Sequence, residues 1–205
     1  MAGIKSVVDD AGKLLSLPPR PVSGTGIAYG AVDGFPVQVR HVKEGNNQRI
    51  EVLIRHDADQ HADLIRRGLD NDSQLGKHKV RGKSVQFDAG LLVWKRAKGM
   101  RAIPASEVAD VTRGLVTALR SVSSAPAGQC RHCGAAANDL CLVDGVVDRV
   151  CGACTVKLTA DAEEVNRAYD RLPIRYGVAV PVGLVLALIG AAGWAGLTIA
   201  TERMF

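Results

Sequence analysis

Apolar and polar positions divide the first 122 residues of the chain into a series of short elements. Apolar residues recur at helical spacing across residues 3–16, which predicts an amphipathic helix, and the proline-rich segment 17–21 ends it. Three successive segments then have the composition of strands, with clear alternation in the second, and the first two are joined by Asp33-Gly34, a sequence typical of a two-residue hairpin turn. The three predicted strands are 26–31, 35–43 and 48–56.

The pattern then returns to helical spacing and back to strand. A helix is predicted over residues 58–69, with Leu64, Ile65 and Leu69 as its buried stripe. Residues 76–99 again have the composition of strands, interrupted by turn residues.

A last helix in this region, over 104–122, has a continuous apolar stripe. These elements predict an α+β domain over residues 20–122, with an antiparallel sheet and helices on one face, preceded by the amphipathic helix and proline linker at 1–19. The order of helix, three strands, helix, two or three strands and helix is similar to that of type III secretion chaperones and their relatives. That resemblance implies a domain that binds other proteins.

Near the end of the chain the hydropathy pattern changes. Residues 176–201 contain no charged side chain, and their apolar part would span about 36 Å as a helix, against a hydrocarbon core of about 30 Å. We therefore expect a transmembrane helix over 176–201. Arg167, Arg171 and Arg175 precede it, so the positive-inside rule places the N-terminal domains in the cytoplasm. These features predict a single-pass, tail-anchored membrane protein.

Small residues recur every four positions in the same segment, at Gly183, Ala187, Ala191 and Ala195. A small-residue face lets another helix approach closely, which would support self-association or a helical partner. The alternative is a helix that is merely rich in small residues.

All five cysteines lie between residues 130 and 154. Cys130 and Cys133 form one Cys-x-x-Cys pair, and Cys151 and Cys154 form a second. Between them a β-hairpin is predicted, with Asp144-Gly145 at its turn, and this hairpin returns the second pair to the first. Four converging thiolates predict a closed, structural Zn²⁺ site.

The first ten residues include two acids where a signal peptide would need an apolar run, so we expect reduced thiols and a metal rather than disulfides. A closed four-cysteine site leaves no position for substrate, and we expect no enzyme. Iron in the same geometry and thiol–disulfide exchange by the two pairs are the alternatives. The fifth cysteine, Cys141, is interpreted as a small buried apolar residue.

The spacing Cys-x2-Cys-x17-Cys-x2-Cys resembles that of GATA-type zinc fingers. Residues 130–172, reached through a polar linker at 123–129 and ending in a helix expected over 159–172, are similar to the wider zinc-ribbon and treble-clef group. The resemblance implies that the four paired cysteines are metal ligands. GATA fingers carry a Trp and paired arginines in the hairpin and a basic tail, whereas this hairpin is apolar and residues 130–171 have a net charge of −2. Because DNA binding needs Lys and Arg contacts to phosphate, DNA recognition does not carry over.

The basic excess lies earlier in the chain: 19 of the 26 Lys and Arg precede residue 123, against 13 of the 21 Asp and Glu. Alternate residues of a strand share a face, so these side chains can form a surface for anionic lipid headgroups or, alternatively, nucleic acid. An ordinary solvated face is the third interpretation. The residues concerned are Lys77, Lys79, Arg81, Lys83, Lys95, Arg96, Lys98 and Arg101.

Together these features predict a membrane-anchored cytoplasmic zinc-binding protein that acts, without catalysis, as an interaction or scaffold module for a protein partner or a second copy. A membrane-tethered nucleic-acid-binding protein that uses the basic α+β domain is one alternative. A thiol–disulfide oxidoreductase that uses the Cys-x-x-Cys pairs is the other.

Overall fold

The computed structural model describes residues 4–18, 26–45, 47–97, 103–171 and 184–187. The chain divides into two compact units, Met1–Lys157 and Leu158–Phe205, and each is treated by itself. The sheet, the helices that cover it and all five cysteines belong to the first unit.

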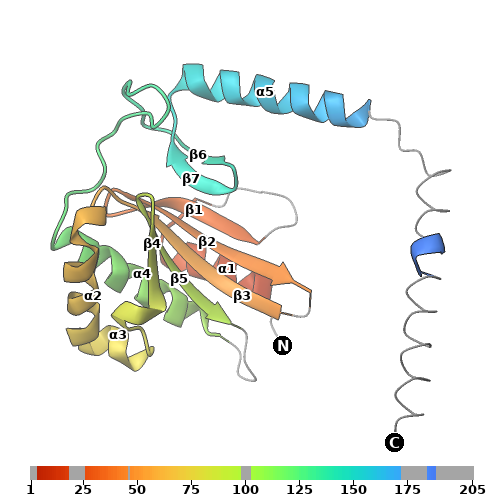
Figure 1. The fold of residues 1–205 in the computed structure, drawn as a ribbon. Helices are drawn as coiled ribbons and strands as arrows, with labels where there is room; N and C mark the ends of the chain where they lie inside the picture. The colour runs from red at the N-terminus through yellow and green to blue at the C-terminus, as the bar shows by residue number, and fades with distance from the viewer. Residues whose placement is uncertain (1–3, 19–25, 46, 98–102, 172–183, 188–205) are drawn as a thin grey trace, which may run out of the picture. The chain divides into compact units, whose positions relative to one another are not determined.

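A five-stranded antiparallel sheet with the order β1-β2-β3-β5-β4 forms the centre of the first unit (Figure 1). Its first hairpin turns at Asp33 and Gly34, whose φ angles are 50° and 85°. Positive φ at both positions matches the twist of the flanking strands, which explains why this dipeptide joins β1 to β2 without a longer loop. The strands are β1 (Ile27–Val32), β2 (Phe35–Glu44), β3 (Asn47–Arg55), β4 (Val85–Asp88) and β5 (Leu91–Ala97).

Helices α1 (Ile4–Leu14) and α4 (Ala105–Arg120) cover one face of this sheet (Figure 1). Apolar residues of α4 at helical spacing are fully buried, as the sequence pattern predicts. They pack in one apolar cluster with alternate residues of β2 and β3. The residues that alternate with them on β2 and β3 point to the opposite face. The buried residues of α4 and of this sheet face include Val108, Val111, Leu115, Leu119, Val37, Val39, Ile50, Val52 and Ile54.

The opposite face is covered in part by a second, two-stranded sheet. Strands β6 (Leu140–Val143) and β7 (Val146–Arg149) form the predicted hairpin, and β7 lies against β2 and β3. Gln38, Glu51 and Leu53 point to this face and are 0–2% exposed, although alternation alone would assign their positions to solvent. The central strands are therefore buried on both faces.

Three predictions about local structure are wrong. Residues 73–77 form the short helix α3 (Ser73–Lys77), and residues 76–81 contain no strand, although one was expected there. The break expected at Gly82-Lys83 is a 3-10 turn, Gly82–Ser84. Asp72 explains the helix, because its carboxylate accepts hydrogen bonds from the backbone N–H groups of Gln74 and Leu75 and so caps the N-terminus.

In α2 (Ala62–Asn71), Ile65 and Leu69 are buried as predicted, but Leu64 is 50% exposed. Successive residues of a helix point in different directions, so Leu64, which directly precedes Ile65, lies on the solvent side. Helix α5 (Gly152–Asp170) begins seven residues earlier than expected, directly at the second cysteine pair.

The predicted transmembrane helix at 176–201 is corrected, and with it the tail anchor and the single-pass membrane localisation. Among the residues that the structure describes, no helix is both long enough and apolar enough to cross a membrane. Helix α5 has 19 residues, but it carries charged side chains along its length, and their burial in hydrocarbon would be costly. Most of the predicted segment, 176–183 and 188–201, lies outside the described residues, and within it only 184–187 are described, as one helical turn.

Candidate metal centre

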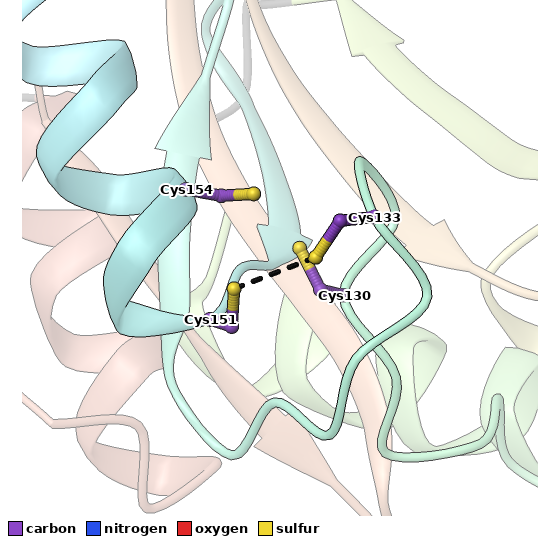
Figure 2. A group of neighbouring side chains, drawn as sticks. All are labelled: Cys130, Cys133, Cys151 and Cys154. Carbon is purple, nitrogen blue, oxygen red and sulfur yellow. Dashed lines mark hydrogen bonds between the residues drawn. The ribbon is translucent and has the colours of Figure 1, made fainter.

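The fold brings together the four paired cysteines, Cys130, Cys133, Cys151 and Cys154 (Figure 2). Their sulfur atoms all lie within 4.8 Å of one another, and Sγ of Cys133 is 3.6 Å from Sγ of Cys151. A tetrahedral zinc ion with Zn–S bonds of about 2.3 Å would hold its sulfurs about 3.8 Å apart. The four thiols can therefore close around one metal ion with small side-chain adjustments.

The first pair lies in a tight turn. The N–H of Gly134 donates to the carbonyl of Cys130 at 2.8 Å, and Gly134 has a φ of 74°, which glycine adopts without strain. The N–H of Arg131 donates to the carbonyl of Arg149 at 3.1 Å and so attaches this turn to the end of β7. The first pair is thus positioned by its own turn and by the hairpin.

The second pair is delivered by the hairpin and a helix start. Asp144 and Gly145, with φ angles of 51° and 76°, make the two-residue turn between β6 and β7. Cys151 directly precedes α5 and Cys154 lies in its first turn, so both sulfurs are at a helix N-terminus (Figure 2). One sequence signal could have revealed this start, because no proline separates Cys151 from the segment predicted to be helical.

Crowding of the four thiols changes their protonation. Hydrogen bonding from the backbone of Cys151 is the main reason that the pKa of Cys130 is lowered to about 6. Hydrogen bonding with Cys133, followed by burial, raises the pKa of Cys154 to about 12. A hydrogen bond from the backbone of Ala135 lowers the pKa of Cys133, but hydrogen bonds with neighbouring thiols such as Cys151 contribute in the opposite direction. The pKa of Cys133 is raised overall. Neighbouring thiolates repel one another, so full ionisation of the cluster requires a bound cation.

The donor set and its enclosure suit a metal with a structural role. Four thiolates are soft ligands, typical of zinc and of single iron centres. Cys130 is only 2% exposed, Cys151 and Cys154 are half-buried and Cys133 is exposed. Four thiolates on one tetrahedral ion would leave no open position. The fifth cysteine, Cys141, is half-buried, and its Sγ lies 4.0 Å from Oγ1 of Thr155, outside the cluster.

A buried glutamine connects the metal-binding segment to the sheet. Gln38 is fully buried on β2; its Nε2 donates to the carbonyl of Gly145 and its Oε1 accepts from the N–H of Val147, both at 3.0 Å. Arg40 also donates to the carbonyl of Gly145, at 3.0 Å, and forms an ion pair with Glu51 at 2.8 Å. A polar side chain satisfied in this way fixes the position of the hairpin, because any displacement would leave buried polar groups unpaired.

Ion pairs make a second connection. Asp148 of β7 is 8% exposed and pairs with Arg55 of β3 at 3.1 Å and with Arg131 of the first cysteine turn at 3.4 Å. Sequence analysis missed Gln38, Arg55 and Asp148. The one available signal was the uninterrupted apolar run Val52-Leu53-Ile54 in β3, which is typical of a strand buried on both faces.

The predicted basic surface does not lie on one strand face. Lys77 ends α3, and Arg81 and Lys83 lie at the following 3-10 turn, where Arg81 donates to the carbonyl of Asp70 at 2.6 Å. Lys79 lies between these elements with a φ of 58°. These cations therefore lie on different local elements rather than along one strand.

The remaining basic residues are also dispersed. Lys95 of β5 lies opposite Glu51 in the sheet register, whereas Arg96 pairs with Glu107 of α4 at 3.7 Å, on the helix-covered face. Lys98 and Arg101 lie outside the described residues. An anionic partner for these side chains stays a prediction.

The small residues predicted for helix packing are only partly described. Ala187 lies in the helical turn 184–187 and is exposed. Gly183, Ala191 and Ala195 lie outside the described residues.

Comparison with known proteins adds no relative. No protein-family model matches the chain, and neither the curated proteins nor the solved structures yield a match. The metal centre therefore rests on the geometry of its own four cysteines.

Proposed function

We propose that residues 1–157 are a non-catalytic interaction module in which one structural zinc ion holds the β6–β7 hairpin on the sheet. The observation that carries this proposal is the convergence of four sulfur atoms within 4.8 Å at the point where the first cysteine turn, the hairpin and the start of α5 meet. The order of cysteine turn, hairpin and helix-start cysteines also resembles a treble clef, which supports zinc as the metal.

A structural role follows from the number of ligands. Four thiolates fill the tetrahedral shell, so a bound ion has no vacant position for water or substrate. The hairpin has only eight strand residues, and apart from Val147 its strands hold little buried apolar surface. Metal binding on the order of 10 kcal/mol would supply the stability that its small core lacks.

The geometry favours this role over thiol–disulfide exchange. An attacking thiolate must be accessible to its substrate, yet Cys130, the one thiol with a markedly lowered pKa, is 2% exposed. The two cysteine pairs also face a common centre, as the ligands of one metal ion would.

For the interaction role, we propose that the hairpin and the sheet against which β7 lies together form the surface that a partner binds. We expect a protein partner, or a second copy of the chain, to bind this metal-held arrangement. Metal loss would separate the hairpin from the sheet and weaken binding.

Elemental analysis of protein purified under reducing conditions tests the metal directly. We expect one zinc ion per chain, and its loss in the Cys151→Ser variant. Cys141→Ser is the matched control, because Cys141 lies on the same hairpin outside the sulfur cluster. A metal-free wild-type protein with a reversible disulfide would contradict the proposal and favour the oxidoreductase.

The interaction role needs a separate measurement. Partners captured by the wild-type protein and the Cys141→Ser variant should be identified and tested for direct binding, and Cys151→Ser should lose them. Partner binding that survives metal removal unchanged would remove the link between the zinc ion and the interaction.

A further inference from the structure

A cleft of about 330 Å³ lies beside the metal centre, where the end of β3, the segment that leads to Cys130 and the end of β7 meet. Its charged lining comprises three arginines, Arg55, Arg131 and Arg149, and two carboxylates, Asp57 and Asp148. All of these residues belong to the first unit. The cleft is distinct from the sulfur cluster, although Cys130 contributes to its wall.

The charges in this cleft do not balance. Asp148 is the buried carboxylate, and it already pairs with both Arg55 and Arg131. Asp57 is exposed. Arg149 forms no ion pair among the described residues, and its guanidinium donates only to the carbonyl of Gly34, at 3.0 Å. Two carboxylates, one of them exposed, thus face three guanidinium groups, which leaves an excess of one positive charge.

The arginine side chains are held in place before any ligand arrives. Arg55 Nη1 and Arg131 Nη2 both donate to the carbonyl of Ala89 at 3.3 Å, and the N–H of Arg131 is fixed to the carbonyl of Arg149. Each guanidinium has five N–H donors, and these contacts use only some of them. Nε of Arg55 and Nε of Arg149 are buried and have no hydrogen-bond partner within the described part of the chain.

We propose that this cleft binds a small oxyanion, a phosphate or carboxylate group, through Arg131 and Arg149 with Arg55 behind them. Planar guanidinium groups match both oxyanions, because two parallel N–H donors meet two oxygens. The proposal rests in part on the proposed function, since the metal-held turn positions Arg131.

The test is calorimetric titration of the metal-loaded full chain with inorganic phosphate and, separately, with acetate, at low ionic strength. We expect saturable binding at one site, with a Kd on the order of 1 mM. Preference for phosphate would assign the ligand as a phosphate-bearing molecule, and preference for acetate would assign a carboxylate. If neither anion binds saturably, the proposal is wrong.

Arg149→Ala should weaken binding about tenfold or more, the effect expected for loss of a charge-assisted bidentate contact. Arg149→Lys should recover only part of the lost affinity, because lysine restores the charge but not the two parallel N–H donors of the guanidinium group. Arg113→Ala is the control, since Arg113 is an exposed arginine of α4 outside the cleft. Arg131→Ala gives a second route if Arg149→Ala fails to fold, because Arg131 is 47% exposed.

Metal content is measured on every sample, so the two proposals fail in different ways. Unchanged anion binding in Arg149→Ala or Arg131→Ala with full metal content would overturn the oxyanion site alone. A wild-type protein without metal would overturn the proposed function, whatever the anion titration gives.

Discussion

The two faces of the central sheet are covered in different ways. On one face, α1 and α4 bury a continuous apolar cluster that needs only shape and hydrophobicity. On the other, the β6–β7 hairpin is held by a buried glutamine, by ion pairs at Asp148 and, as we propose, by a metal ion. The first face is stabilised by packing, whereas the second depends on a few directional contacts, and we expect that it can be lost separately.

Metal removal should give the largest effect and distinguish the two faces most clearly. Chelation or Cys151→Ser would remove stabilisation on the order of 10 kcal/mol from the hairpin. Hydrogen exchange should then show loss of amide protection across residues 130–154, with protection retained in α4. Cys141→Ser should match the wild type, and equal loss in α4 would show that the two faces do not separate.

Acidification should weaken the same face without a mutation. Cys154, with a pKa of about 12, and Cys133, whose pKa is raised, are protonated at neutral pH and must lose protons to bind metal. Metal affinity therefore rises with pH, and at least two displaced protons imply a loss of at least about four decades between about pH 8 and about pH 6. Competition with a chromophoric chelator measures this slope. A flat profile would contradict thiolate ligation.

Leu115→Ala should weaken the helix-covered face instead. Leu115 is fully buried in the apolar cluster, and truncation of such a leucine costs about 3 kcal/mol. Urea denaturation should report this loss, while metal content stays at the wild-type level. Leu64→Ala is the control, because Leu64 is a helical leucine that is 50% exposed and should have little effect.

Gln38→Ala should give the smallest effect, confined to the junction of hairpin and sheet. It leaves the N–H of Val147 and the carbonyl of Gly145 without this partner, at a cost of about 1–3 kcal/mol. We expect a lower melting temperature and faster amide exchange at Val147, with the metal retained. Gln86→Ala removes an exposed strand glutamine and serves as control. If both variants melt alike, Gln38 does not hold the hairpin.

Much of the fold was accessible from the sequence because it depends on neighbouring residues. Helical spacing located α1 and α4, alternation located β1 to β3, and the Asp-Gly dipeptides located two hairpin turns. The spacing of Cys130, Cys133, Cys151 and Cys154 was sufficient to predict that their thiols meet, since a short hairpin must return the second pair to the first.

Errors arose where context outweighed local pattern. The cap at Asp72 starts α3, whose last two residues were expected in a strand, and the helix start at Gly152 placed the second cysteine pair on a helix N-terminus. An apolar run at 176–201 predicted a membrane span that no helix in the described residues provides. The basic residues, alternate in sequence, fell on different elements and on opposite faces.

The sequence by itself determined the local elements and the meeting of four cysteines, because turn chemistry, hydrophobic period and ligand spacing act over short stretches of chain. Only the tertiary structure decided that the hairpin lies on the sheet. That contact joins Gln38 to Val147 and Arg55 to Asp148, residues about a hundred positions apart. No local pattern encodes which buried polar group will meet which partner, and the arginine-lined cleft exists only because they meet.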